Sequence, residues 1–251
     1  MKTISVTSIG DLIRHVAERV RSESKILWFR GQRSSEWDVQ PAIWRDYDVD
    51  DERNFTNRFV SRAGTRHEEL PVYDDSAGWL SLMQHYGVPT RLLDWSRSPL
   101  IAVYFALERY IYHSDTTIQD ASIWILEPHT LNELEEMGEV TPSINAHMCE
   151  EMLSPAFSHR GQENDKVFAV MAAERDLRMY IQQGCFTIHS SRTALNKRRD
   201  CSMFLSEIRI PAECIKDFAF SIDVCGYRKG DMFPDLQNLA DELKGIYKPR
   251  K

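Results

Sequence analysis

The sequence predicts an α+β fold in which a mixed or antiparallel sheet forms the core and helices flank it. Segments with helical spacing of apolar residues are interspersed with short apolar runs typical of strands. The two types do not alternate in the regular order of a parallel sheet, and no internal repeat or linker interrupts them. The 251 residues, 42% of them hydrophobic, can bury a sizeable core. We therefore expect a single domain over residues 1–251.

The first elements are a helix and a strand. Ser8 and Asp11 have the spacing of a helix-capping pair, and apolar residues then recur at helical intervals, which predicts a helix over 9–22. An apolar, β-favouring run predicts a strand over 25–30 that ends in Arg30.

The acidic stretch 45–53 predicts a solvated connection, and residues 52–63 can form a second helix. That helix would stack Arg58, Arg62 and Arg66 on one face at intervals of four residues. A stripe of solvated arginines is the ordinary interpretation of such a pattern.

The middle of the chain predicts a buried helix over 96–113, which is apolar on nearly every side, and a buried strand over 121–128. The acidic residues that follow predict a surface helix that ends at Gly138.

The last third predicts three strands and a final amphipathic helix. Val167 to Val170 and Cys185 to His189 have strand character, with a helix or turn over 172–182 between them. Residues 204–211 alternate cleanly and predict another strand, and the helix after Pro234 has Asp235 as its expected N-cap.

Charge and composition limit the classes of function. The net charge of −7 argues against nucleic-acid binding through the overall field, although a local basic patch is compatible with it. The N-terminus has no apolar core of signal-peptide type and no run is long enough to span a bilayer, so we expect a cytoplasmic protein without membrane contact. Five cysteines, with no C-x-x-C pair, fit reduced thiols and exclude the usual cysteine zinc site, so we expect no metal.

The densest polar stretch precedes the buried helix, in "QHYGVPTRLLDWSRSP" (84–99). It contains His85, Arg91, Asp94 and Trp95. Burying these polar groups costs free energy unless they form hydrogen bonds with each other or with a ligand. An Arg91–Asp94 pair that closes a turn beneath Trp95 is the structural alternative.

Arg30 raises a similar question. A strand that ends in Arg-Gly can hold a fixed cation at a sheet edge, where Gly31 tolerates unusual backbone angles, and this would suit a phosphate or carboxylate. The same pattern is equally typical of a strand whose last residue is simply exposed to solvent.

The ordered segments "WFRGQ", "QPAIWR", "QHYGVPTRLLDW", "QQGCFTIH" and "FPDLQNLA" resemble the bacterial FRG-domain family. The family takes its name from Phe-Arg-Gly, here Phe29-Arg30-Gly31, and the resemblance extends over roughly residues 8–242. Members of the family are often met in bacterial defence settings, so the resemblance implies a role in antiviral defence or as a toxin effector.

A second resemblance, to ADP-ribosyltransferases, implies a nucleotide-binding cleft between the "WFRGQ" strand and the 84–95 segment. In it Arg30 and Arg91 would hold the phosphates of NAD, which is the expected cofactor. Asp94 and Ser96 would occupy the positions of the second motif, and Tyr86 or Trp95 would stack on the nicotinamide. His85 and Trp95 would shape the pocket for the base or nicotinamide.

The third transferase motif differs, because "QQGCFTIHSS" contains no glutamate. Gln183 or His189 would have to contact the ribose, or Glu207 would have to reach it from the next strand. Neutral glutamine cannot stabilise an oxocarbenium-like transition state as a carboxylate does. The acceptor of a transfer reaction would be a protein or a nucleic acid.

Two other functions remain open. The chain can be a non-catalytic binding module for a nucleotide, a nucleic acid or a phage protein, or a nuclease that uses His85 and Asp94. A basic loop could contact nucleic acid or a phosphorylated partner, but such loops are more often only solvated. It contains Arg192, Lys197, Arg198 and Arg199.

Overall fold

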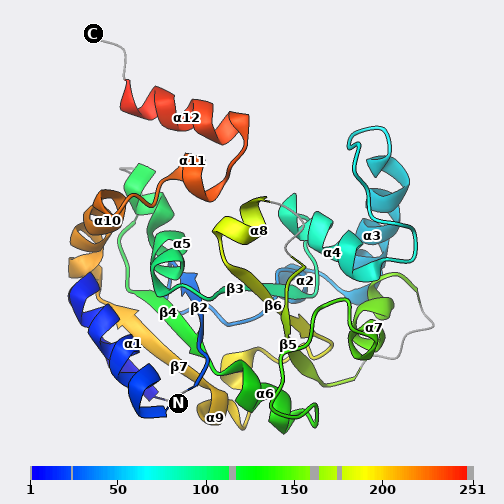
Figure 1. Ribbon diagram of the computed structural model, residues 1–251, viewed down its shortest axis with the longest axis horizontal. Helices are drawn as coiled ribbons and strands as arrows, with labels where there is room; N and C mark the ends of the chain where they lie inside the picture. The colour runs from blue at the N-terminus through cyan, green and yellow to red at the C-terminus, as the bar shows by residue number, and fades with distance from the viewer. Residues whose placement is uncertain (1, 24, 113–116, 159–163, 174–176, 248–251) are drawn as a thin grey trace.

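The computed structural model describes residues 2–23, 25–112, 117–158, 164–173 and 177–247 (Figure 1). Its centre is one seven-stranded sheet with the order β1-β7-β4-β2-β3-β6-β5. β1 is parallel to β7, and every other neighbouring pair is antiparallel. The sheet is flanked by helices, so the α+β prediction is confirmed. The strands are β1 (Lys2–Ser5), β2 (Trp28–Gln32), β3 (Leu92–Ser96), β4 (Ala121–Leu126), β5 (Val167–Met171), β6 (Gly184–His189) and β7 (Leu205–Ile210).

The described helices differ widely in length, and the longest, α1, α3 and α5, have 14 or 15 residues. They are α1 (Ile9–Glu23), α2 (Ile43–Asp46), α3 (Val49–Ala63), α4 (Ser76–His85), α5 (Pro99–Tyr112), α6 (Pro128–Leu134), α7 (His147–Leu153), α8 (Leu177–Ile181), α9 (Cys201–Phe204), α10 (Ile215–Val224), α11 (Lys229–Met232) and α12 (Leu236–Ile246). None of the helices in the described ranges has the length and apolar character needed to cross a membrane.

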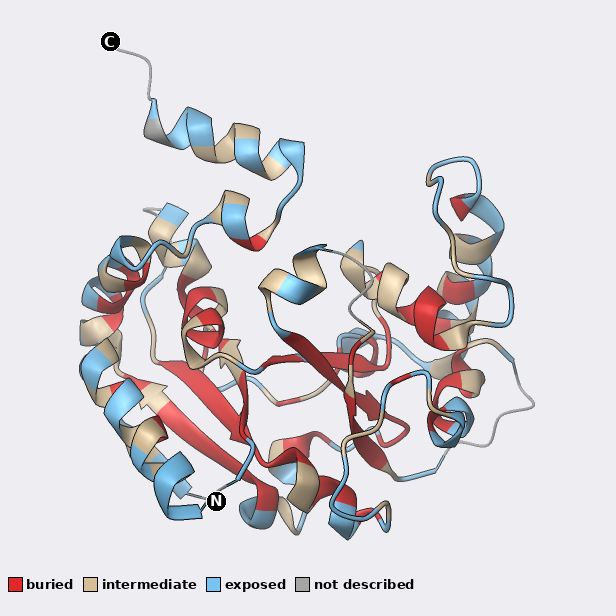
Figure 2. Cartoon of the chain, viewed as in Figure 1, coloured by how far each residue is buried: buried red, intermediate tan, exposed pale blue. Residues whose placement is uncertain are grey.

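Apart from the edge strand β1, both faces of the sheet are largely buried, as the red strands of Figure 2 show. We call one of them the α5 face. There α1, α5 and α10 cover the half that contains β4 and β2, and α4 and α7 pack against the half that contains β3, β6 and β5. The opposite face, here the tryptophan face, buries Trp28, Trp95 and Trp124 with Leu131 of α6 and Phe204 of α9.

The sheet is weakly joined between β2 and β3. Their only paired residues are Phe29 and Ser96, whereas β2 pairs with β4, and β3 with β6, over five residues each. Beyond Phe29 the two strands diverge, and the guanidinium of Arg30 bridges the split.

Local patterns located most elements correctly. The predicted helix over 9–22 is α1, in which the backbone N–H of Asp11 donates to Ser8 Oγ at 3.1 Å. The buried helix is α5, and Asp235 caps α12 by accepting from the backbone N–H of Asn238 at 2.8 Å. The strands expected around 121–128, 167–170, 185–189 and 204–211 are β4, β5, β6 and β7.

Three predicted boundaries were wrong. β2 continues to Gln32, so Arg30 lies in the middle of its strand, because β4 offers a partner to every residue through Gln32. The acidic connection 45–53 largely belongs to α3, since Asp48 accepts from the backbone N–H groups of Asp50 and Asp51 and starts the helix. The acidic surface helix ends at Leu134, before Gly138.

Of the predicted helix or turn over 172–182, residues 177–181 form α8 and 174–176 lie outside the described residues.

Candidate anion-binding site

Arg30 lies on the tryptophan face of β2, where the strand separates from β3. Side chains alternate along a strand, so Arg30 shares its face with Trp28, while Phe29 and Gly31 face α5. Nη1 of Arg30 donates to the backbone oxygen of Asp94 at 2.7 Å, and Nε is buried without an acceptor. Burial lowers the pKa of Arg30 to about 10, which leaves the guanidinium charged at neutral pH.

Gly31 is required by close packing rather than by an unusual backbone angle. A Cβ atom at this position would lie 1.8 Å from the backbone oxygen of Ala102 and 2.7 Å from the backbone nitrogen of Ala106, both in α5. Gly31 lies inside β2 and does not adopt the unusual backbone angle that a strand end would have used. The glycine instead lets α5 lie directly on β2.

His189, at the end of β6, is also on the tryptophan face and completely buried. Trp95 Nε1 donates to Thr187 Oγ1 at 3.0 Å, and the same hydroxyl lies 2.8 Å from His189 Nε2. We assign the hydroxyl hydrogen to the bond with Nε2, which leaves a proton on Nδ1. Nδ1 is buried and has no partner.

His189 is neutral in the folded protein. Burial lowers its pKa to about 3, and the positive charges of Arg198, Arg30 and Arg91 act in the same direction. A neutral imidazole with a free N–H is a hydrogen-bond donor, so His189 can bind an oxygen atom but is a poor general base at this position.

A third buried donor, Trp44 Nε1 of α2, also lacks an acceptor. The guanidinium of Arg192 lies 5.1 Å from the centre of the Trp44 ring, and that of Arg91 lies 5.7 Å from it. Arg91 connects these donors, because its guanidinium lies near the Trp44 ring and its charge, with that of Arg30, lowers the pKa of His189. On these shared neighbours we group Arg30, Trp44 and His189 as the donor cluster. Exposed Arg45, whose charge also lowers the pKa of Arg30, and exposed Arg192 form its rim.

The positive charge of the donor cluster is not balanced by an ion pair among the described residues, although the Asp94 carboxylate stabilises the charge of Arg30 from a distance. Within the described residues, Arg30, Arg45 and Arg192 form no ion pair, while Arg91 and Arg198 are paired with Glu52 and Glu135. Buried donors normally have acceptors, because an unsatisfied one costs about 1–3 kcal/mol. The arrangement therefore suits an anion with several oxygen atoms, such as a phosphate.

Arg91 belongs to the core and not to the donor cluster. Its guanidinium donates to both carboxylate oxygens of Glu52 and to the backbone oxygen of Met152, with no exposed surface. The hydrogen-bond donors of Arg91 are therefore taken up by protein acceptors. Arg91 does not have the free guanidinium expected of a residue that binds the phosphates of NAD. The alternative Arg91–Asp94 turn pair is wrong as well, because Glu52 supplies the partner from α3.

Trp95 and Ser96 are structural too. The Trp95 ring packs in the core of the tryptophan face and its Nε1 is already bonded to Thr187, so protein contacts occupy it. Ser96 Oγ donates to the backbone oxygen of Gln182 at 2.8 Å and accepts from the backbone N–H of Ser98 at 3.0 Å. These bonds tie the end of β3 to the start of α5 and to the segment before β6.

The side chain of Asp94 points to the α5 face, away from the donor cluster. Its Oδ2 accepts from Gln84 Nε2 at 2.6 Å. Gln183 is exposed at the start of β6, the end opposite to His189, and has a left-handed backbone angle φ of 48°. Asp94 contributes its backbone oxygen and the electrostatic effect of its carboxylate to Arg30, and Gln183 contributes nothing to the donor cluster.

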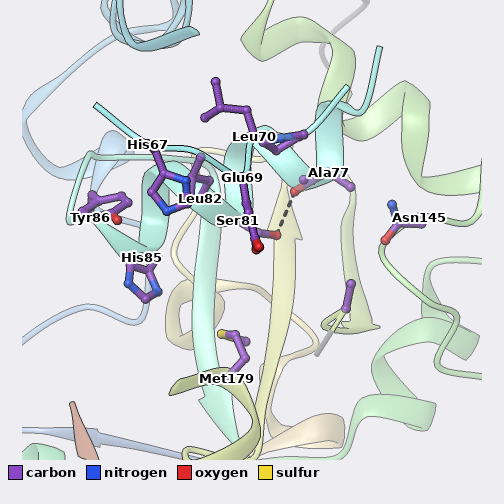
Figure 3. Close-up of a pocket in the computed structure, with 13 residues that line it drawn as sticks. His67, Glu69, Leu70, Ala77, Ser81, Leu82, His85, Tyr86, Asn145 and Met179 are labelled. Carbon is purple, nitrogen blue, oxygen red and sulfur yellow. Dashed lines mark hydrogen bonds between the residues drawn. The ribbon is translucent and has the colours of Figure 1, made fainter. Parts of the chain in front are cut away.

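His85 and Tyr86 line a cavity of about 260 Å³ on the α5 face, between α4 and α8 (Figure 3). His67 and Glu69 also line this cavity, and Met179 closes it from α8. Because Arg30 points to the other face, the expected cleft between the "WFRGQ" strand and the 84–95 segment is not formed by these side chains. The sheet lies between them.

Sequence reasoning missed Trp44 and Arg45 as site residues, although their segment "QPAIWR" was one of the recognised motifs. Arg192 stood out only as part of a basic loop. No group of three or more His, Cys, Asp or Glu side chains in the described part of the chain is arranged to hold a metal ion.

Comparison with known proteins gave one match. Residues 25–115 match the family model of the FRG domain, a segment that contains Arg30, Trp44 and Arg45. No curated protein and no solved structure matched the chain.

Proposed function

Since residues 25–115 of this chain match the FRG domain model, we propose that the protein binds a nucleotide of the NAD type and that the donor cluster holds the phosphates. The observation that carries this proposal is the set of three buried donors without acceptors: Arg30 Nε, Trp44 Nε1 and His189 Nδ1. The phosphate oxygens of a nucleotide would satisfy them.

The rim arginines are open to solvent. Arg45 and Arg192 are exposed and form no ion pair among the described residues, and Arg30 is half-buried. Charge-assisted hydrogen bonds to phosphate are about twice as strong as neutral ones. The ligand would therefore meet the rim arginines first and bond to Arg30 and His189 as it loses water.

The geometry favours recognition of the nucleotide over its consumption. β6 carries no carboxylate, and His189 is neutral. Glu207 of β7 lies on the face of Arg30, but Trp124 of β4 separates them in the register. Glu207 is also buried and accepts hydrogen bonds from Ser122 and Thr3. A binding module, in bacterial defence or another setting, needs no such carboxylate.

ADP-ribosyl transfer is the second candidate, and one observation favours it. β2 and β3, which contain the two segments that resemble transferase motifs, are neighbours in the sheet, and β6, which contains the segment that differs from the third motif, lies next to β3. In that mechanism Glu207 is the carboxylate nearest in register to Arg30 on their common face, and a local shift of β7 would have to release it from Ser122.

Calorimetric titration with NAD tests the binding proposal. We expect saturable binding by the wild type, no binding by Arg30→Ala, and a several-fold weaker affinity for the double variant Arg45→Gln and Arg192→Gln. The double variant changes only exposed side chains, so it keeps the test valid if Arg30→Ala fails to fold. Matched substitutions of exposed Arg14 and Arg21 by glutamine control for the loss of charge. Equal affinity in the rim variant and this control would refute the proposal.

Whether the protein consumes NAD distinguishes a binding module from an ADP-ribosyltransferase. After long incubation with the protein and candidate protein or nucleic-acid acceptors, recognition leaves NAD intact, whereas transfer releases nicotinamide. Release that disappears in Glu207→Gln but persists in the Arg14 and Arg21 control would replace the binding module by the transferase.

A further inference from the structure

We propose that a second site, on the α5 face and separate from the donor cluster, binds an aromatic phosphate of nucleotide size. It is a groove of about 530 Å³ between α3 and the end of α4. We call it the arginine groove. It is lined by Phe55, Arg58, Phe59, Arg62, Ala63, Arg66, His67, Leu82, Tyr86 and Val88.

The three arginines supply the site for the anion. Arg58, Arg62 and Arg66 are exposed and form no ion pair among the described residues, although the chain as a whole is acidic. α3 ends at Ala63, so Arg66 lies just beyond it, contrary to a stripe on one continuous helix. The turn after α3 nevertheless keeps it beside Arg62, because Arg66 Nη1 donates to the backbone oxygen of Arg62 at 2.8 Å.

Aromatic rings form the apolar wall of the groove. Phe55 and Phe59 are half-buried, and Tyr86 is 56% exposed, with its ring centre 6.5 Å from that of Phe59. An aromatic ligand can pack against these rings while its phosphate reaches the arginines. The volume lies in the usual range for sites that bind small molecules, about 300–1,000 Å³.

His67 adds an unsatisfied polar group to the same wall. Its Nδ1 is buried without a partner, and its ring meets that of Tyr86 edge-on at 6.1 Å. His67, Leu82 and Tyr86 line both this groove and the smaller cavity of Figure 3. A ligand in the groove can therefore bond to His67 and extend its ring system toward the smaller cavity.

These features fit a small ligand better than a polymer. The net charge of −7 opposes attraction of a nucleic-acid chain, whereas one phosphate needs only a local cluster of cations. The mixture of rings and unpaired arginines matches a molecule with an aromatic part and an anionic part.

Calorimetry with AMP as the probe tests the inference. We expect AMP to bind more tightly than adenosine or inorganic phosphate, because each of these offers only one of the two parts. Substituting Arg58, Arg62 and Arg66 by glutamine should weaken AMP binding roughly tenfold or more. Substituting exposed Arg14, Arg21 and Lys216 by glutamine removes the same charge elsewhere and should leave the affinity unchanged.

Arg30→Ala separates this site from the donor cluster. AMP affinity that survives Arg30→Ala but falls in the groove variant supports the arginine groove, whatever the fate of NAD binding. AMP affinity that is lost only in Arg30→Ala would overturn the inference and leave the proposed function standing. No binding of AMP at millimolar concentration, or equal affinity in the groove and control variants, would also overturn it.

Discussion

Arg91 and Glu52 form a completely buried ion pair between the start of β3 and the first turn of α3. Glu52 Oε1 accepts from the backbone N–H of Arg91 at 3.0 Å and from its Nε at 3.1 Å, and Oε2 accepts from Nη2 at 2.5 Å. Both side chains are 0% exposed. The pair therefore anchors α3, which carries the arginine groove, to the central sheet.

Glu52→Gln should be strongly destabilising, because it leaves the charge of Arg91 buried without compensation. We expect a loss of about 3–5 kcal/mol in the free energy of unfolding. Urea denaturation followed by circular dichroism measures it, with Lys244→Gln, at an exposed ion pair, as a control that leaves the midpoint unchanged. If both charges are replaced, by Glu52→Leu with Arg91→Met, most of the lost stability should return. A single variant as stable as wild type would contradict the structural role of the pair.

Gly31→Ala should unfold or severely weaken the protein. The added methyl group would lie 1.8 Å from the backbone oxygen of Ala102, and backbone atoms of a packed helix cannot move aside cheaply. We expect a loss of about 3 kcal/mol or more, measured by thermal unfolding. Gly10→Ala in α1 is the matched control. Its nearest atom would be 3.7 Å away, and alanine favours the helix, so this variant should be at least as stable as wild type.

His189 should make stability depend on pH in the mildly acidic range. Its pKa is about 3 when folded and near 6.5 when unfolded, so between these values only the unfolded chain binds the proton. The resulting stability is complete above the unfolded pKa and is lost as pH falls, by about 2 kcal/mol between pH 7 and pH 5. Urea midpoints at several pH values for wild type and His189→Gln isolate this contribution. Identical pH profiles would show that His189 is not buried and neutral.

The five thiols should differ widely in reactivity. Cys225 is exposed, whereas Cys149 and Cys185 are buried, and burial raises the pKa of Cys149 to about 11 and that of Cys185 well above its usual value. Iodoacetamide at pH 8, followed by peptide mass analysis, should modify Cys225 first and leave Cys149 and Cys185 intact. Labelling in urea provides the control, since all five should then react. Rapid native labelling of Cys185 would be inconsistent with its place in β6.

The sequence by itself determined the local elements. Spacing of apolar residues located α1, α5 and the strands β4, β5, β6 and β7, because the periods of helices and strands are local properties of the chain. The motif residues also identified the resemblance to the FRG domain that the family model matches over residues 25–115, and they singled out Arg30 and His189, which lie on the same face of the sheet.

The tertiary structure decided which side chains meet. Nothing near Arg91 in the sequence indicated that its partner would be Glu52, 39 residues earlier. Nor did local pattern show that Arg30 and His85 would lie on opposite faces of the sheet, or that Trp44 would lie near the guanidinium groups of Arg91 and Arg192. The physical reason is that strand order and register assign each side chain to a face. Both arise from pairing between distant segments, which local periodicity does not encode.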